Sequence, residues 1–187
     1  VQLAYFETTR HPGSPRVAYA FARVLLVGDP KPGTPAFSLA VSTFKRTADL
    51  PNAGLLPWQG LILLYARNDL PIPEAWWQAM RKYVRTHSLT PQDRNALYMM
   101  LEPLVKGGAP YPPEGVGSVL QEARKAHPEN VTILTMQANF LLNVTGNIEQ
   151  AGQLLEKAVR MSPENPALWR NLIDFQLRTG QLGSAER

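Results

Sequence analysis

The sequence predicts an all-α protein built from four to five antiparallel helical hairpins that stack side by side. Residue identities recur at a spacing of 34 to 35 residues, as in repeat proteins. Apolar residues follow the i, i+3, i+4, i+7 spacing of a helix face and do not alternate as in strands. Glycine and proline interrupt the chain about every 15 residues, which is the length of a helix rather than of a strand.

The repeat is clearest in the last third of the chain. The motif Pro-Glu-Asn occurs at residues 128–130 and again at 163–165, which is 35 residues later. Further pairs lie 34 or 35 residues apart: Gly117 and Gly152, Leu120 and Leu155, Ala123 and Ala158, Gly146 and Gly180, Ala151 and Ala185. The change from 35 to 34 places one extra residue near 144–145, where we expect a turn.

Each repeat contains two helical patterns. Residues 134–142 and 151–159 both carry one apolar helix face. Gly146 and Gly180 follow first helices, where a left-handed glycine ends a helix at low cost. The proline of each Pro-Glu-Asn motif separates one hairpin from the next.

The first two thirds of the chain follow the same pattern less regularly. We expect helices over residues 15–27, 36–50, 56–67, 73–87, 91–103 and 114–126. Thr90 is expected to cap the fifth of these, with Pro91 at its first position, and Pro103 to kink or end it. Residues 2–10 are expected to form the second helix of a hairpin whose first half is missing.

Composition argues against an enzyme. The 187 residues contain no cysteine, which excludes disulfide scaffolds, thiolate zinc sites and cysteine nucleophiles. We find no phosphate-binding loop, nucleophile elbow or metallohydrolase motif, and the three histidines fall on separate helix ends. We therefore expect no catalytic residue, no cofactor and no metal.

The charge is mildly basic. The net charge is +4, and the excess lies in the first two thirds of the chain. Nucleic-acid binders concentrate more charge on one face, so we expect no nucleic acid as partner. The alternative is a basic nucleic-acid or saccharide-binding module using Arg81, Lys82 and Arg85 with an exposed Trp76 or Trp77. No stretch of 18 apolar residues occurs, so we expect no membrane insertion within this chain.

The last two repeats resemble tetratricopeptide repeats (TPRs). That family favours a large residue early in the first helix, glycine at the turn, small residues in the second helix and proline at the exit. The matching residues are Leu134, Trp169, Ala138, Gly146, Gly180, Ala151, Ala185, Leu155, Ala158 and Pro163. Ile173, which is not small, and the extra residue near 144–145 depart from the pattern.

The resemblance implies a right-handed superhelix. Residues 113–187 would be TPR-like repeats, and residues 1–112 divergent helical hairpins of the same continuous solenoid. It also implies a non-catalytic scaffold for protein–protein interaction, which binds a peptide or a neighbouring domain in a concave groove. The first helix of each hairpin would line this groove.

Aligning the first helices assigns residues to the groove. The aligned polar positions are Tyr19, Thr135 and Arg170, then Arg23, Asn139 and Asp174, and then Asn143 and Arg178. The Lys and Asn set with which the family clamps a C-terminal carboxylate is not present, so we expect a different ligand. A plain solvated face on each helix explains the same pattern, and this alternative stays open.

A second resemblance concerns the whole chain. Residues 11–16, the apolar helix after them, the degenerate middle and the TPR-like end are similar to the soluble C-terminal repeat region of some bacterial multi-pass membrane proteins. Those proteins have a glycosyltransferase-like or polymerase-like membrane part. This resemblance implies a periplasmic tail of a glycan-handling enzyme; otherwise we expect a cytoplasmic protein.

The ends of the chain suggest a fragment of an array. The chain begins at Val1 without a signal peptide, so we expect a processed product or an excised piece. An array cut at both ends exposes apolar faces that its neighbours would cover. We therefore expect that the chain can associate with itself through these ends.

Overall fold

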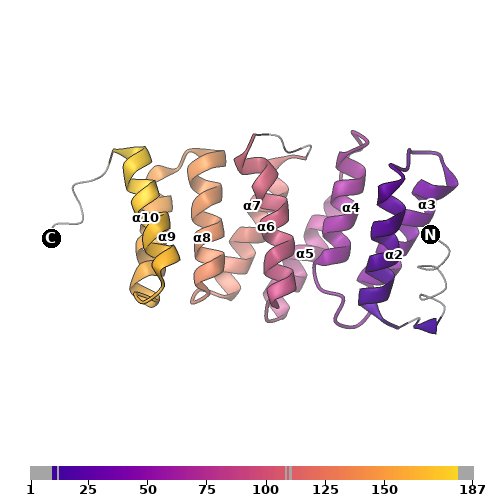
Figure 1. Ribbon diagram of the computed structural model, residues 1–187, viewed down its shortest axis with the longest axis horizontal. Helices are drawn as coiled ribbons and strands as arrows, with labels where there is room; N and C mark the ends of the chain where they lie inside the picture. Colours follow the sequence, from indigo (N-terminus) through magenta and orange to yellow (C-terminus); the bar gives the residue numbers. More distant parts are fainter. Residues whose placement is uncertain (1–9, 12, 108, 110, 181–187) are drawn as a thin grey trace.

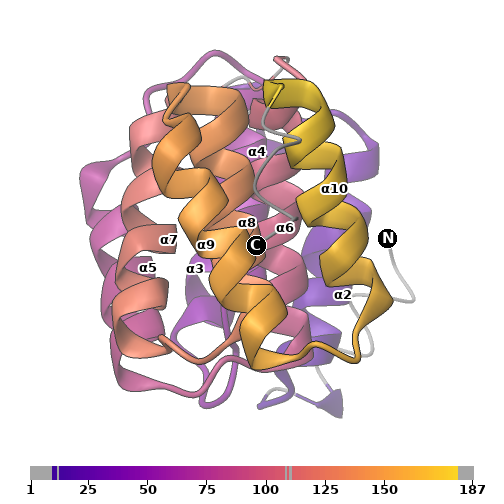
Figure 2. The ribbon, with the colours of Figure 1, turned by 90° about the vertical axis from the view of Figure 1, so that its left-hand side faces the viewer.

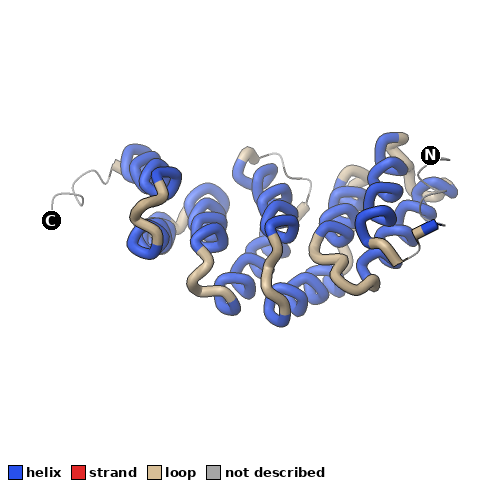
Figure 3. Tube along the Cα trace, turned by 60° about the horizontal axis from the view of Figure 1, so that its bottom comes forward, coloured by secondary structure: helices blue, strands red, loops and turns tan. Residues whose placement is uncertain are grey.

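The chain is a row of α-helices. The computed structural model describes residues 10–180 apart from residues 12, 108 and 110. The helices stand side by side from α2 and α3 at one end to α9 and α10 at the other (Figure 1). Within the described residues there is no strand (Figure 3). The prediction of an all-α solenoid is confirmed.

Nine α-helices and one π-helical turn are described. They are α2 (Pro15–Val27), α3 (Pro35–Ala48), α4 (Leu56–Ala66), α5 (Glu74–Thr86), α6 (Pro91–Val105), α7 (Pro113–Ala126), α8 (Val131–Phe140), η1 (Leu141–Thr145), α9 (Ile148–Met161) and α10 (Pro166–Thr179). Helix α2 packs against α3, α6 against α7 and α8 against α9 as consecutive pairs, and α10 packs against α9. The helix predicted for residues 2–10 lies almost wholly outside the described residues. No helix in the described part is long and apolar enough to span a bilayer.

The helix starts are encoded locally. Side chains of Ser14, Thr34, Thr90, Asn130 and Asn165 accept hydrogen bonds from backbone N–H groups of the first helical turn. These short polar residues satisfy N–H groups that have no partner inside the helix. Proline follows most of them at the first helical position, where its missing N–H costs nothing. The cap predicted at Thr90 is confirmed, and Asp93 completes a capping box.

Pro103 does not end α6, which continues to Val105. Of the two predicted outcomes, the helix end at Pro103 is therefore wrong, and the kink stays a prediction. The proline lies in the last turn, where it removes only one backbone hydrogen bond. The N–H of Lys106 still donates to the carbonyl of Glu102 at 3.1 Å, so the helix closes normally after the proline.

The extra residue near 144–145 is not in a turn, as the spacing predicted, but inside a helix. Residues Leu141–Thr145 form a π-helical turn that continues α8. The carbonyl oxygen of Leu141 accepts hydrogen bonds from the N–H groups of Gly146 and Asn147. A single inserted residue is accommodated in a helix by such a wider turn, which occurs frequently at functional sites.

Four helical glycines allow an aromatic ring to contact the backbone of a neighbouring helix. The pairs are Gly60 with Phe44, Gly115 with Trp77, Gly117 with Phe140, and Gly152 with Phe175. A Cβ atom at Gly117 would lie 2.6 Å from the ring of Phe140, which is closer than real Cβ contacts. The last two pairs are 35 residues apart, so the repeat in the sequence corresponds to a repeated contact between helices.

The second helices of successive hairpins are not evenly spaced. Helices α5 and α7 pack along each other extensively, whereas α7 and α9 make no comparable contact. In the view along the row, α5 and α7 lie on one side of the molecule, and α2 and α10 on the other (Figure 2). A groove opens where α7 and α9 diverge.

Replacing Ala151 by Trp should destabilise the fold. Ala151 is fully buried in α9 within the cluster that includes Leu134 and Leu155. The larger side chain should lower the free energy of unfolding by about 1–3 kcal/mol through overpacking. Urea unfolding measures this, with the exposed Ala167→Trp as control. Equal stability of the two variants would contradict the packing of Ala151 between helices.

Replacing Gly115 by Ala should also destabilise, although alanine is the better helix former by about 1 kcal/mol. The new methyl group would overlap the ring of Trp77, which is 3 % exposed. We expect a net loss of about 1 kcal/mol or more in the same assay. At Gly152 a Cβ atom would lie 3.0 Å from Phe175, so Gly152→Ala should cost less. A gain in stability for Gly115→Ala would refute the close-contact role.

Candidate functional site

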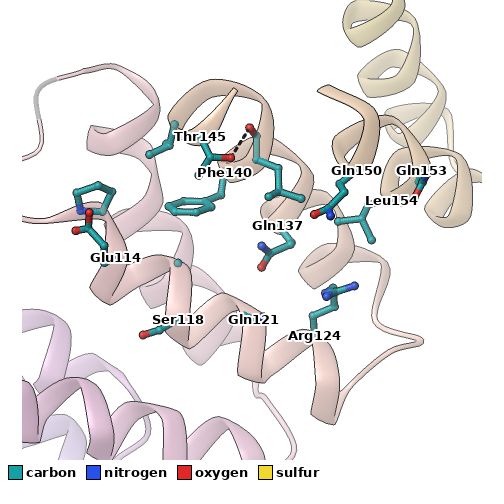
Figure 4. A pocket seen from close by; sticks show the side chains of 14 residues that line it. Glu114, Ser118, Gln121, Arg124, Gln137, Phe140, Thr145, Gln150, Gln153 and Leu154 are labelled. Carbon is teal, nitrogen blue, oxygen red and sulfur yellow. Dashed lines mark hydrogen bonds between the residues drawn. The ribbon is translucent and has the colours of Figure 1, made fainter. Parts of the chain in front are cut away.

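A groove lies between α7 and α9, with α8 and η1 as its floor (Figure 4). It has a volume of about 660 Å³. Its polar lining includes Ser118, Gln121, Arg124, Gln137, Gln150 and Gln153. Phe140, Leu141, Val144 and Leu154 supply apolar surface. The groove therefore combines amide, cationic and apolar side chains from three helices and the π turn.

Two polar atoms of this groove lack hydrogen bonds. Gln137 Oε1 and Arg124 Nε are buried and have no partner among the described residues. Leaving a buried polar group unpaired costs about 1–3 kcal/mol, so such groups are rare in folded proteins. Both side chains point into the space between α7 and α9 (Figure 4). These two unpaired atoms make the groove the candidate functional site of the described structure.

The repeat makes Gln137 more unusual. The equivalent residue 35 positions later is Leu172, which is buried in the C-terminal core cluster. Packing alone therefore favours leucine at this position. Gln137 is only 6 % exposed and gains no hydrogen bond for its Oε1 atom. A residue that lowers the stability of the fold, as a buried unpaired glutamine does, is expected at a functional site.

Two charged residues line the groove, and neither is paired. Glu114 lies in the first turn of α7, and Arg124 lies in its last turn. Neither side chain forms an ion pair with any described residue. By contrast, Lys125 and Glu122 of the same helix pair with each other at 2.9 Å. The groove thus carries one unpaired charge of each sign.

The first-helix positions predicted from the sequence lie elsewhere. None of the eight predicted residues lines the groove between α7 and α9. Thr135 and Asn143 donate hydrogen bonds to carbonyls of their own helix, the latter to Asn139. Arg178 of α10 donates to Asn143 Oδ1 at 2.6 Å, which joins successive first helices. Asn143 and Arg178, which the alignment makes equivalent, are therefore in contact in the structure.

The remaining predicted positions are dispersed. Arg170 and Asp174 are exposed on α10, and Arg23 is exposed on α2. Tyr19 is half-buried, and its ring packs edge-on against Phe44 at 6.1 Å between centroids. The first-helix face remains a predicted surface, and its residues are not gathered into one cavity.

A second cavity, of about 410 Å³, includes Tyr19, Tyr83 and Asp93. Asp93 accepts hydrogen bonds from Leu55 N–H at 2.8 Å, from Thr90 and from the Tyr83 hydroxyl. Burial and the Asp93 carboxylate raise the pKa of Tyr83 to about 12, which keeps the hydroxyl protonated as a donor. Because these contacts satisfy both Asp93 oxygens, Asp93 here connects the starts of α4 and α6.

The side-chain positions do not favour the alternative of a basic nucleic-acid or saccharide-binding module. Trp76 and Trp77 are 6 % and 3 % exposed, so the expectation that one of them is accessible is wrong. Both pack in the core, as large apolar rings favour. Arg81 donates a hydrogen bond to Ser118 at 2.9 Å and forms an ion pair with Glu74. Of the three basic residues Arg81, Lys82 and Arg85, Arg81 is thus already bound to neighbouring side chains.

Reasoning from the sequence did not identify the groove residues. The missed residues are Glu114, Gln121, Arg124, Gln137, Gln150 and Gln153. Two signals were available: a glutamine where the repeat has leucine, and the extra residue before Gly146. Neither signal shows that α7 and α9 diverge, because their spacing depends on contacts with other helices.

Comparison with known proteins agrees with this architecture. The tetratricopeptide repeat family matches residues 145–187. No curated protein matches the chain. Tetratricopeptide repeats generally mediate protein–protein interactions and are generally not catalytic. The match covers residues 145–187 and fits a TPR-like repeat at this end of the chain, and the packing of the described helices fits a helical-repeat solenoid.

Proposed function

We propose that the chain is a non-catalytic scaffold that binds an extended segment of a partner protein. The observation that carries this proposal is the groove between α7 and α9, with its unpaired Gln137 and Arg124 atoms. Solenoids present long open surfaces of this kind to protein partners.

The chemistry of the groove suits a peptide. Gln121 lies on one wall, and Gln150 and Gln153 lie on the other. Each carboxamide both donates and accepts hydrogen bonds. An extended peptide also offers N–H and C=O groups along both edges, so the two walls can pair with its main chain. The apolar floor then receives side chains.

A second surface supports the same function. The hydrogen bond between Arg178 and Asn143 shows that polar residues of successive first helices reach one another. We propose that the first-helix face, with Arg23, Asn139, Arg170 and Asp174, contacts a neighbouring domain or a second peptide segment.

Selection from a random peptide library displayed on phage tests the proposed function. The 187-residue chain should enrich peptides that bind saturably, at one peptide per chain, in isothermal titration calorimetry. Gln121→Ala with Gln150→Ala should weaken those that use the groove. If no displayed peptide binds the folded chain, the scaffold proposal fails.

The first-helix face has a separate test. Asn139→Ala combined with Arg170→Ala should weaken partners that use this face. It should leave the free energy of unfolding within about 0.5 kcal/mol, as is usual for surface sites. Peptides that use the groove between α7 and α9 should bind this double variant normally. If no selected ligand loses affinity, the first-helix face is not a binding surface.

A further inference from the structure

We propose that the groove between α7 and α9 selects an extended peptide with an acidic and a basic side chain four residues apart and an apolar side chain midway between them. This inference rests on the proposed function and specifies its ligand. The acidic side chain pairs with Arg124 and the basic one with Glu114.

The spacing follows from the position of the two charges. Glu114 and Arg124 are ten residues apart on α7, which corresponds to about 15 Å along a helix. They lie toward opposite ends of the groove (Figure 4). An extended peptide rises about 3.3 Å per residue, and alternate side chains face the same side. Side chains four residues apart therefore share a side and span about 13 Å, which matches the separation of the two charges.

The middle of the groove is apolar and amide-lined. Phe140 lies between Glu114 and Arg124 in Figure 4. The partly exposed Leu141 and Val144 also line the groove. The peptide side chain midway between the two charges faces the same side as they do. An apolar residue there, such as leucine, covers this floor.

Gln137 recognises the peptide backbone. Its Oε1 atom is unpaired, and Arg124 Nε is an unpaired donor in the same groove. The terminal torsion of a glutamine side chain is soft, so the carboxamide can turn toward a ligand. A peptide group supplies both the N–H that Gln137 Oε1 requires and the C=O that Arg124 Nε requires.

The test uses fluorescein-labelled nonapeptides, acetylated and amidated at their ends, and fluorescence anisotropy with the full chain. One pair carries Asp-Ala-Leu-Ala-Lys and its reversed order at the centre. The matched peptides have the same composition with Asp and Lys adjacent. The spaced peptide, in at least one order, should bind about tenfold more tightly than the adjacent one. Equal affinities would overturn the proposal.

A charge reversal locates the acidic contact. Arg124→Glu should weaken the spaced peptide at least about tenfold, and should prefer a peptide with Lys in place of Asp. Lys125→Glu is the matched control, because Lys125 is adjacent in the helix but does not line the groove. It should change affinity by less than about twofold, as is usual for rim charges. Equal losses in both variants would show a general charge effect and refute the specific contact.

Gln137→Leu separates binding from stability. It places the residue of the equivalent repeat position, Leu172, at Gln137 and removes the unpaired oxygen. The melting temperature should stay the same or rise, while peptide affinity falls by about fivefold or more. Unchanged affinity would refute the role of Gln137.

The proposed peptide specificity and the proposed scaffold function can be refuted separately. Should phage-selected peptides bind the chain without dependence on Arg124 or Gln137, the groove specificity is wrong while the scaffold function stands. Should neither the designed nor the selected peptides bind, both are wrong.

Discussion

The close approach of an aromatic ring to a helical glycine is the contact on which the spacing of this solenoid depends. Gly115 and Gly117, at the start of α7, admit Trp77 from α5 and Phe140 from α8. Glycine costs about 1 kcal/mol of helix stability relative to alanine, and burial of a large ring on the bare backbone offsets that cost. Two glycines in one turn thus anchor α7 to two different helices.

This anchoring also explains where the row opens. The Trp77 contact holds α7 against α5, so α7 follows the preceding hairpin on this side of the molecule. Helix α9 instead packs on α8 and α10, through a core cluster that includes Ala151 and Phe175. The π turn at Leu141–Thr145 lies in the chain between α8 and α9. The groove is the space between α7, which packs on α5, and α9, which packs on α8 and α10.

The two cavities differ in how their polar groups are satisfied. Asp93 in the smaller cavity receives hydrogen bonds from a backbone N–H of a neighbouring loop, from its own cap residue and from Tyr83. It therefore stabilises the junction between hairpins. Gln137 and Arg124 in the groove retain unpaired atoms, which is unfavourable for folding. Buried polar residues thus stabilise the fold at Asp93, whereas at Gln137 and Arg124 we propose that they recognise a peptide.

The sequence by itself determined the helices and their order, because caps such as Thr90 and apolar periodicity act over a few residues. It also indicated Gly117 and Gly152 as equivalent, although not that each contacts an aromatic ring 23 residues later. Only the tertiary structure decided that the inserted residue forms a π turn and that α7 and α9 diverge. The groove depends on distances between helices, which arise from ring-to-backbone contacts that local patterns do not encode.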